Sequence, residues 1–550
     1  MPSSANPADL ILKNGVIWRG KGTGTAQALA AANGRIFAVG TDADVTGLIG
    51  PDTQVIDLGG RFATPGLNED HLHLIATGLA LDMVDASVEA APTLQALMDA
   101  LRARAAETPK GEWVIARGYD QAKLDVARHP HLSELDAAVP DHPVLLRRAC
   151  GHVSIVNSRA MKLAGITADT PAPDGGVIEV ANGRLTGFLA ENAQELVDSQ
   201  IPEPSVDQIT TAIERAGAQL LSQGITSCMD AAVGMVAGVD EIRAYHLARR
   251  DGSLPVRVSL TLLGDPSRSI VEDCHRLGLV TGVGDDMLRV GAVKVFLDGS
   301  VGGRTAWMRH HYLDQPKNFG VQMLPTQQVE GLIAQYHDMG YQMACHAIGD
   351  GAINQLVTAY EKALEASPDA DRRHRVEHCG YPDEALNQRM KAAGIEPSPQ
   401  QVFLYDFGDS YISVMGKPAT ESAYPLKTWL DMGFHPGTGS DSPVCRTDPF
   451  PNLYSMVTRK TWKGTVMDER EAVDIETALQ VYTENGAYLT HDEGRKGRLE
   501  VGMLADIAVF SRNLLDAAPE DILNDTECDL TIIDGRIGYD RHGLGQGTGA

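Results

Sequence analysis

The 550-residue sequence lacks any long, uninterrupted hydrophobic run. No stretch approaches the roughly 18 apolar residues that a membrane-spanning helix needs, so we expect no such helix and no membrane partner. The amino terminus also lacks a basic segment followed by an apolar one, and we expect no secretory signal. With a hydrophobic content of 43% and a charged content of 22%, the composition is typical of a soluble globular protein.

Positive charge is scarce. The chain has 47 lysine and arginine residues against 73 aspartate and glutamate residues, for a formal net charge of −26. Because an acidic surface repels phosphate backbones, this balance argues against a nucleic-acid partner. It does not restrict the substrate, since one cationic pocket can exist in an acidic protein. We expect a small-molecule substrate, and a homodimer is one possible assembly.

Cysteine is sparse and shows no pairing pattern. The seven cysteines are scattered and odd in number, and none forms a C-x-x-C motif. A reduced, cytoplasmic environment is the simplest explanation.

Both ends of the chain have the pattern of β-structure. Short apolar runs in residues 1–63 are separated by Asn-Gly and Gly-Gly turns, and residues 497–550 have the same texture. Such turns suit hairpins. We therefore predict one composite β-sandwich built from both termini.

The middle, residues 64–496, alternates strand-like runs with amphipathic helical segments such as 205–223 and 326–339, which is typical of parallel β/α architecture. Eight strands can be placed, and eight β/α units predict a closed α/β (TIM) barrel with its active site at the carboxyl ends of the strands. The gap after the first strand is too long for one loop and helix, so we predict an inserted lid or substrate subdomain at about 80–215. The expected strands are 63–74, 224–231, 255–263, 288–298, 340–349, 372–380, 394–401 and 433–443.

Polar residues that can bind a metal lie near the ends of these predicted strands. His71 and His73 are two positions apart, and residues at that spacing point to the same face of a strand. Imidazole and carboxylate groups suit Zn²⁺ and similar ions. We predict one or two divalent ions, zinc by preference, held by His71, His73, Lys294, His346, His378 and Asp441.

Lysine is an unusual member of such a set, because an ammonium cannot bind a cation. In a desolvated pocket its pKa falls, and the neutral amine can take up CO₂ as a carbamate whose two oxygens bridge two metals. A bound metal lowers the pKa of a water molecule from about 15.7 towards about 7. Asp441 could then ligate the metal or carry a proton from that water to a leaving group.

Each of these residues also has a structural explanation when it is taken alone. His346 could be a hydrogen-bonded core histidine, and His378 could pair with Glu377. Lys294 could be a surface lysine at a strand end, and Asp441 could belong to an Asx-turn or cap a helix. The joint pattern favours a metal centre.

Several segments together resemble the amidohydrolase superfamily, and more narrowly its amidohydrolase family 3, the YtcJ-like proteins. They include PGLNEDHLHL at the first strand, HAIGD (346–350), RVEHC (375–379) and GSDSPV (439–444), and the resemblance extends over nearly the whole chain. It implies a distorted (β/α)₈ barrel with a composite β-sandwich, and metal-dependent hydrolysis of C–N bonds other than peptide bonds. It assigns the six residues to the ligand positions and Lys294 to the lysine that is often carboxylated.

Four further residues are predicted to contact the substrate. His152 matches a family position that faces the site, where it could stabilise an oxyanion or simply pack in the lid. Asp298 and Arg304 belong to a glycine-rich loop directly after the Lys294 strand, and Arg304 could bind a carboxylate or lie on the surface. Trp307 could form the wall of an apolar pocket or belong to the core.

Three functions remain open from the sequence. The first is a metal-dependent amidohydrolase acting on a small N-acyl, formamide, carbamate or cyclic amide compound, with Asp441, His378 and His152 as catalytic residues. The second is a deaminase or ester hydrolase of the same superfamily, and the third is a metal-free binding protein. Metal analysis separates the third from the others, and ammonia release without carboxylate formation would favour deamination.

Overall fold

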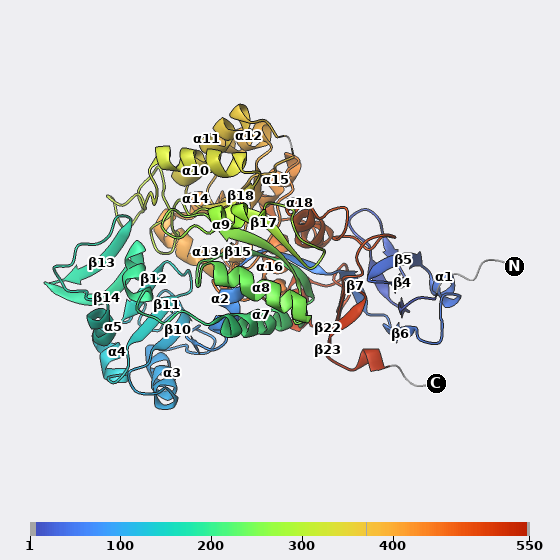
Figure 1. Ribbon diagram of the computed structural model, residues 1–550, viewed down its shortest axis with the longest axis horizontal. Coiled ribbons are helices and arrows are strands. Elements are labelled where there is room, and N and C mark those ends of the chain that lie inside the picture. Colours follow the sequence, from blue (N-terminus) through green and yellow to red (C-terminus); the bar gives the residue numbers. More distant parts are fainter. Residues whose placement is uncertain (1–6, 370, 547–550) are drawn as a thin grey trace.

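The computed structural model describes residues 7–369 and 371–546. Figure 1 shows three regions along the long axis of the molecule: a central barrel, a mixed subdomain at one end, and β-sheets that carry both termini at the other end. The sequence order of the three regions is interleaved, because the subdomain is inserted after the first barrel strand.

The barrel contains seven parallel strands in sequence order within the described residues. Their residues are almost entirely buried, as expected for a parallel sheet covered on both faces. The strands are β8 (Leu67–Leu72), β15 (Ile225–Val233), β16 (Arg257–Leu263), β17 (Leu288–Lys294), β18 (Gln342–Ala347), β19 (Arg375–His378) and β20 (Glu396–Ser398).

The predicted eighth strand, 433–443, is not a regular strand in the structure. This segment nevertheless lies beside β8, because Asp70 N donates to Thr438 O at 3.1 Å and Asp441 N donates to His71 O at 2.8 Å. Asp441 has a φ of 54°, a conformation that interrupts a strand. A Cβ at Gly439 would lie 2.6 Å from the His71 backbone, so glycine permits this close approach.

Helices cover the outside of the barrel (Figure 1). The predicted helix at 205–223 is α7, where the Ser205 hydroxyl accepts from Gln208 N and the Gln208 side-chain oxygen accepts from Ser205 N, which is a capping box. The helices are α2 (Leu74–Ala80), α7 (Val206–Leu221), α8 (Val239–Asp251), α9 (Val271–Arg276), α10 (Thr326–Asp338), α11 (Asp350–Ala366), α12 (Glu384–Ala393), α13 (Val402–Met415), α14 (Lys417–Glu421), α15 (Leu426–Asp431), α16 (Pro449–Thr458), α17 (Ile475–Gln480) and α18 (Gly486–Leu489).

The inserted subdomain, which we call the lid, has a six-stranded sheet in the order β13-β14-β12-β11-β10-β9. Asn157 accepts from Ala160 N and caps helix α5, a role that its position before an amphipathic run favours. The elements are β9 (Val84–Asp85), β10 (Val114–Tyr119), β11 (Val144–Arg148), β12 (Val153–Val156), β13 (Gly176–Ala181) and β14 (Arg184–Glu191), with α3 (Leu94–Glu107), α4 (Leu132–Ala138), α5 (Ser158–Leu163) and α6 (Glu195–Asp198).

The two chain ends share one pair of sheets. The first sheet has the order β5-β4-β1-β6, and the second, β23-β22-β21-β7-β2-β3, combines strands from both ends. Apolar side chains of both sheets form a single core. The elements are β1 (Leu10–Lys13), β2 (Val16–Trp18), β3 (Thr25–Ala26), β4 (Ala28–Ala32), β5 (Arg35–Gly40), α1 (Asp42–Thr46), β6 (Gln54–Asp57), β7 (Phe62–Pro65), β21 (Ile507–Phe510), α19 (Pro519–Asp525), β22 (Cys528–Ile533) and β23 (Arg536–Asp540).

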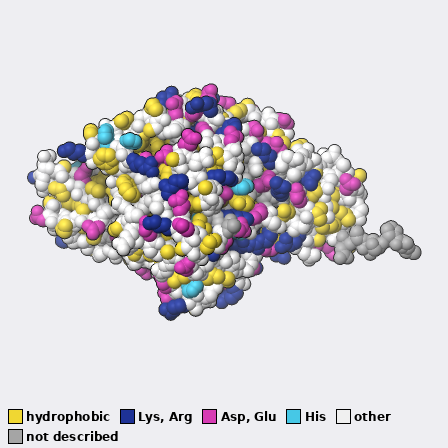
Figure 2. Space-filling model, turned by 90° about the horizontal axis from the view of Figure 1, so that it is seen from above, with side chains coloured by type: hydrophobic (Ala, Val, Ile, Leu, Met, Phe, Trp, Pro, Cys, Tyr) yellow, Lys and Arg dark blue, Asp and Glu magenta, His cyan; other side chains and the backbone are white. Residues whose placement is uncertain are grey.

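The predicted fold class is therefore confirmed: a distorted α/β barrel with a composite β-sandwich from both termini and an insertion after the first barrel strand. The domain limits predicted at 63, 80, 215 and 497 stay predictions. In the described part of the chain, no helix is both long and apolar enough to cross a membrane. Figure 2 shows acidic and basic side chains interspersed over one face of the molecule, with hydrophobic side chains between them.

Candidate metal centre and substrate pocket

The carboxyl ends of the barrel strands bring the six predicted metal ligands to one place. His71 lies near the end of β8, Lys294 is the last residue of β17, His346 lies in β18, and His378 is the last residue of β19. Because parallel strands end at the same rim, residues from distant parts of the sequence meet there. His71 and Lys294 have no exposed surface, so the centre is shielded from bulk water.

Distances show that the members of this group are neighbours. Asp441 Oδ1 lies 3.4 Å from His71 Nε2 and 3.3 Å from His73 Nε2. Lys294 Nζ lies 3.3 Å from His71 Nε2. The rings of His346 and His378 have centroids 4.4 Å apart, and that of His378 is 4.9 Å from His71.

The donor atoms fit a divalent cation. One ligand atom each from His71, His378 and Asp441 lie within 4.8 Å of one another. Among the residues that the structure describes, Asp441 Oδ1 and His73 Nδ1 are buried and have no hydrogen-bond partner. A buried polar atom without a partner is costly, and a cation beside Asp441 Oδ1 would compensate that carboxylate. Imidazole and carboxylate are donors that zinc and similar ions accept.

Three of the histidines are oriented by contacts on the far side of their rings. His71 Nδ1 is hydrogen-bonded to Glu377 and His378 Nδ1 to Gln400, which leaves Nε2 of both rings for the centre. His346 Nε2 lies 3.2 Å from Gly299 O, which leaves its Nδ1. Such outer contacts fix the tautomer and the orientation of metal-binding histidines.

Glu377 is held in turn by a buried arginine. Arg375 Nε donates to Glu377 Oε1 at 2.7 Å, and its Nη1 lies 3.1 Å from Asp70 Oδ1. Burial alone would raise the pKa of Glu377, but the charges of Arg375 and His71 hold it at about 2. Glu377 is therefore a carboxylate that accepts a hydrogen bond from His71 Nδ1. In the sequence Glu377 could be considered only as a partner of the adjacent His378, whereas the structure places it on His71.

Lys294 is enclosed at the base of the centre. Its side chain has no exposed surface, and its ammonium lies 4.9 Å from the centre of the Phe296 ring. Burial lowers the pKa of Lys294, because a charged group is disfavoured in a low-dielectric site.

A pocket lies over the centre. Aromatic residues of α13 line part of it, and polar residues at the turn between β11 and β12 of the lid line another part. The sequence did not single out Arg148, Phe403 or Phe407, because their shared position depends on the insertion folding over the barrel. The lining residues are Arg148, Cys150, His152, Ser300, Gly302, His346, Ile348, His378, Phe403, Phe407, Tyr411, Asp441 and Val444.

His152 is the predicted substrate contact that the structure brings into this pocket. Its Nδ1 lies 2.7 Å from Glu191 Oε2, and its ring centroid is 5.5 Å from that of His346. Burial would lower the pKa of His152, but the Glu191 carboxylate outweighs it and raises the pKa to about 9. His152 is thus a cation that can donate into the pocket.

Asp298, Arg304 and Trp307 lie outside the pocket lining. Asp298 is fully buried and accepts the backbone N–H groups of Trp307, Ile348 and Gly349 at 2.8, 3.0 and 2.9 Å, so it joins two loops behind His346. Arg304 donates to Asp314 at 2.7 Å, and Trp307 packs against the barrel core. Their predicted substrate-binding roles stay predictions.

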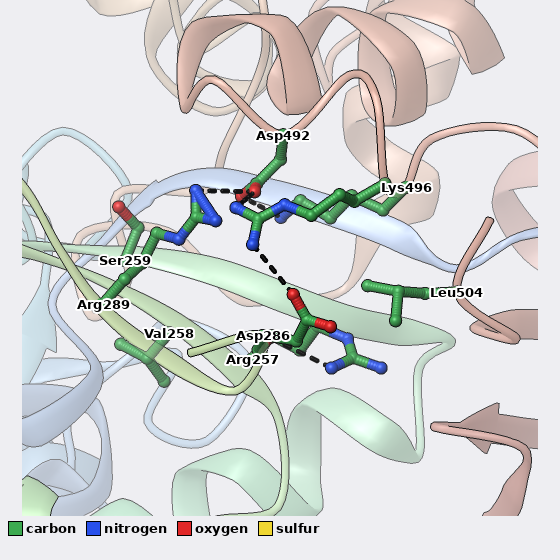
Figure 3. A pocket seen from close by; sticks show the side chains of 9 residues that line it. Arg257, Val258, Ser259, Asp286, Arg289, Asp492, Lys496 and Leu504 are labelled. Carbon is green, nitrogen blue, oxygen red and sulfur yellow. Dashed lines mark hydrogen bonds and ion pairs between the residues drawn. The ribbon is translucent and has the colours of Figure 1, made fainter. Parts of the chain in front are cut away.

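A second pocket lies at the opposite, amino-terminal end of β16 and β17. It is lined by four cations, Arg257, Arg289, Arg495 and Lys496, with Asp286 and Asp492 among them (Figure 3). Each arginine has a carboxylate partner: Arg289 pairs with Asp492 at 2.7 Å, Arg495 with Asp286 at 2.8 Å, and Arg257 with Asp506 at 2.6 Å. The ion pairs around this pocket form a network that joins the barrel to the sheets of the termini.

Comparisons with known proteins agree with this geometry. The amidohydrolase family model (Amidohydro_3) matches residues 54–539. The putative amidohydrolase YtcJ of Bacillus subtilis is 31% identical over 89% of this chain and 91% of its own length. The N-substituted formamide deformylase of Arthrobacter pascens is 29% identical over 94% of this chain and 96% of its own length.

A solved structure extends the likeness to the fold. The crystal structure of an uncharacterized metal-dependent hydrolase from Pyrococcus horikoshii superposes with a TM-score of 0.75 at 25% identity, covering 93% of this chain and 99% of that one. Taken with a family match over most of the chain and with histidines and an aspartate gathered at the carboxyl end of the barrel, this likeness leads to one conclusion: the chain belongs to the amidohydrolase family and is a hydrolase.

Proposed function

We propose that this protein is a metal-dependent hydrolase of a C–N bond in a small molecule: a non-peptide amide, an N-acyl compound, a formamide or a carbamate. The observation that carries the proposal is Asp441, whose buried Oδ1 has no hydrogen-bond partner among the described residues and lies 3.3–3.4 Å from two histidine nitrogens. The similarity to an N-substituted formamide deformylase over nearly the whole of both chains favours this bond type.

In this proposal His71, His73, Lys294, His346, His378 and Asp441 hold one or two divalent ions, with zinc as the first choice. Such an ion, when bound, polarises a carbonyl and makes water acidic enough to react at neutral pH. Glu377 and Gln400 keep the Nε2 atoms of His71 and His378 facing the centre. The buried Lys294 amine carries a carbamate that supplies oxygen ligands.

Asp441 transfers the proton, and His152 stabilises the negative charge that develops on the substrate. Asp441 accepts a proton from the attacking water and delivers it to the leaving nitrogen, as a carboxylate between two histidines at the pocket floor can do. His152, kept cationic by Glu191, donates a hydrogen bond to the substrate carbonyl oxygen as negative charge develops there. The pocket walls exclude bulk water from both steps.

A substrate panel tests the proposal. The purified protein is analysed for metal and assayed on formamides, N-acyl amines, carbamates and simple esters, with the acid and amine products measured separately. We expect C–N cleavage that chelation abolishes and added Zn²⁺ restores. Ammonia release without a carboxylate product would mean a deaminase instead. No bound metal, together with unchanged stability after chelation, would contradict a metal enzyme of either kind.

The carbamate on Lys294 has a separate test. Lys294→Ala should lose at least one equivalent of metal and most activity, and short carboxylic acids should restore part of both by replacing the carbamate oxygens. Unchanged metal content in this variant would show that Lys294 does not take part in metal binding.

A further inference from the structure

Three aromatic side chains of the pocket lie in a row along α13, and the proposed chemistry does not require such a row. Phe403, Phe407 and Tyr411 follow one another at intervals of four residues on α13. Residues at this spacing lie on one face of a helix, and all three line the pocket. Neighbouring ring centroids are 5.6 Å and 6.1 Å apart, so the rings form a continuous row, which we call the α13 row.

One end of the α13 row is at the metal centre. The Phe403 ring stacks on the His378 ring, with centroids 5.9 Å apart and planes inclined by 13°. His378 is a predicted metal ligand whose neighbours His71 and Asp441 form the centre. The row therefore starts beside the reacting atoms and extends away from them along α13.

The rest of the pocket differs in character. Arg148, Cys150 and His152 of the lid line the same pocket, and Arg148 is paired with Asp120 at 3.1 Å. The middle of the row lies near Lys123 of the lid, whose ammonium is 6.0 Å from the Phe407 ring centroid and 3.6 Å from Asp406. A substrate is thus held between a polar wall that suits its carbonyl and an apolar wall that suits a hydrocarbon group.

From this arrangement we infer that the α13 row is the subsite for the nitrogen substituent of the substrate, and that it selects a flat, apolar group of about the size of a phenyl ring. This inference rests on the proposed C–N hydrolysis, because the carbonyl must lie beside Asp441 and His152. The nitrogen substituent then extends over Phe403 and Phe407. Aromatic rings stack with one another more favourably than area burial alone provides, and the rings of Phe403 and Phe407 both line the pocket.

The test compares N-(2-phenylethyl)formamide with N-ethylformamide, which differ by one phenyl ring. We expect kcat/KM to favour the phenyl compound by about 10-fold or more, the range that burial of one apolar group supports. Phe407→Ala should reduce this ratio by about 10-fold, and Phe407→Leu, which keeps a large apolar side chain and the fold, should reduce it less but measurably. Tyr405→Ala is the matched control on the same helix, because Tyr405 packs on Tyr454 outside the pocket.

A binding experiment keeps this inference separate from the proposed reaction. Calorimetry measures the affinity of the protein for 2-phenylethylamine and for ethylamine. Both are ammonium ions, so charge contributes equally to the two affinities. Tighter binding of the phenyl compound that depends on Phe407, without hydrolysis of these formamides or of any amide or carbamate in the substrate panel, would support the subsite and contradict the proposed reaction. Hydrolysis of both formamides at equal kcat/KM would support the reaction and overturn the subsite. Equal binding of the two amines, or a ratio unchanged in both Phe407 variants, would also overturn it.

Discussion

The two ends of the barrel use the same strands in opposite ways. At the amino-terminal end, Arg257, Arg289 and Arg495 each have a carboxylate partner within 3 Å. At the carboxyl end, Asp441 Oδ1 and His73 Nδ1 are buried without a partner in the described residues. The paired arginines and carboxylates stabilise the attachment of the terminal sheets. Asp441 Oδ1 and His73 Nδ1, which have no hydrogen bond to any described residue, keep their capacity to bind an ion or accept a proton. In α/β barrels the first arrangement is typical of stability and the second of catalysis.

The largest effect is expected from Asp441→Asn at the carboxyl end. Activity should fall about 10²- to 10⁴-fold, because the amide cannot accept the proton, while the thermal midpoint stays near that of the wild type. The measurement is kcat together with bound metal per chain. Asp273→Asn, an exposed carboxylate on α9, is the control and should leave kcat unchanged. Near wild-type turnover in Asp441→Asn would refute its proton-transfer role.

The opposite outcome is expected from Arg257→Met at the amino-terminal end. It leaves the buried Asp506 without its two hydrogen bonds of 2.6 and 2.8 Å, and breaking a buried ion pair costs about 3–5 kcal/mol. The thermal midpoint should fall strongly, while kcat/KM per folded molecule measured at low temperature is retained. Arg249→Met removes an exposed pair worth about 0–1 kcal/mol. If Arg257→Met lost activity without losing stability, the amino-terminal end would contribute to catalysis rather than to stability, which would contradict this comparison.

The lid above the carboxyl end should respond to acid. His129 is hydrogen-bonded to Tyr119 at 3.0 Å, and burial, with a contribution from Arg148, lowers its pKa from 6.5 to about 4. The folded state therefore binds this proton less readily than the unfolded state. The resulting stability is present above pH 6.5 and is lost as the pH falls from 6.5 to 4, by up to about 3 kcal/mol.

His129→Gln should therefore flatten the fall of the thermal midpoint between pH 6.5 and 4. His246, exposed on α8, provides the matched control, and His246→Gln should leave the profile unchanged. An identical acid profile for wild type and His129→Gln would show that His129 does not couple the lid to pH.

The smallest effect concerns the contact behind His71. Glu377→Gln keeps the size of the side chain but removes the charge that orients the imidazole, and loss of such a contact weakens metal binding about 10- to 100-fold. A metal-buffered titration of the metal-depleted protein measures this change. Glu361→Gln, on the surface beside Arg389, is the control. Equal metal affinity in Glu377→Gln would mean that the orientation of His71 is set by packing alone.

Local sequence pattern predicted a large part of this molecule. Alternating β/α segments predicted the barrel, and strand ends predicted where His71, Lys294, His346 and His378 meet. The prediction of a regular eighth strand at 433–443 was wrong, because the positive φ at Asp441 and the close approach at Gly439 depend on the neighbouring β8. Arg375 and Glu377 were missed as supports of His71, because their partners are about 305 residues away in sequence.

The alternation of strands and helices, the β-rich ends and the residue types that can bind a metal follow from local spacing and side-chain chemistry, so they can be predicted from the chain alone. Which groups share the pocket depends on the folding of distant segments. His152 of the lid and Phe407 of α13 line the same pocket only because the insertion folds back over the barrel. The fold also pairs the arginines at one end of the barrel with hydrogen-bonded carboxylates, and it leaves Asp441 Oδ1 at the other end among histidines without a hydrogen bond from the described residues, since both depend on distance and orientation in space.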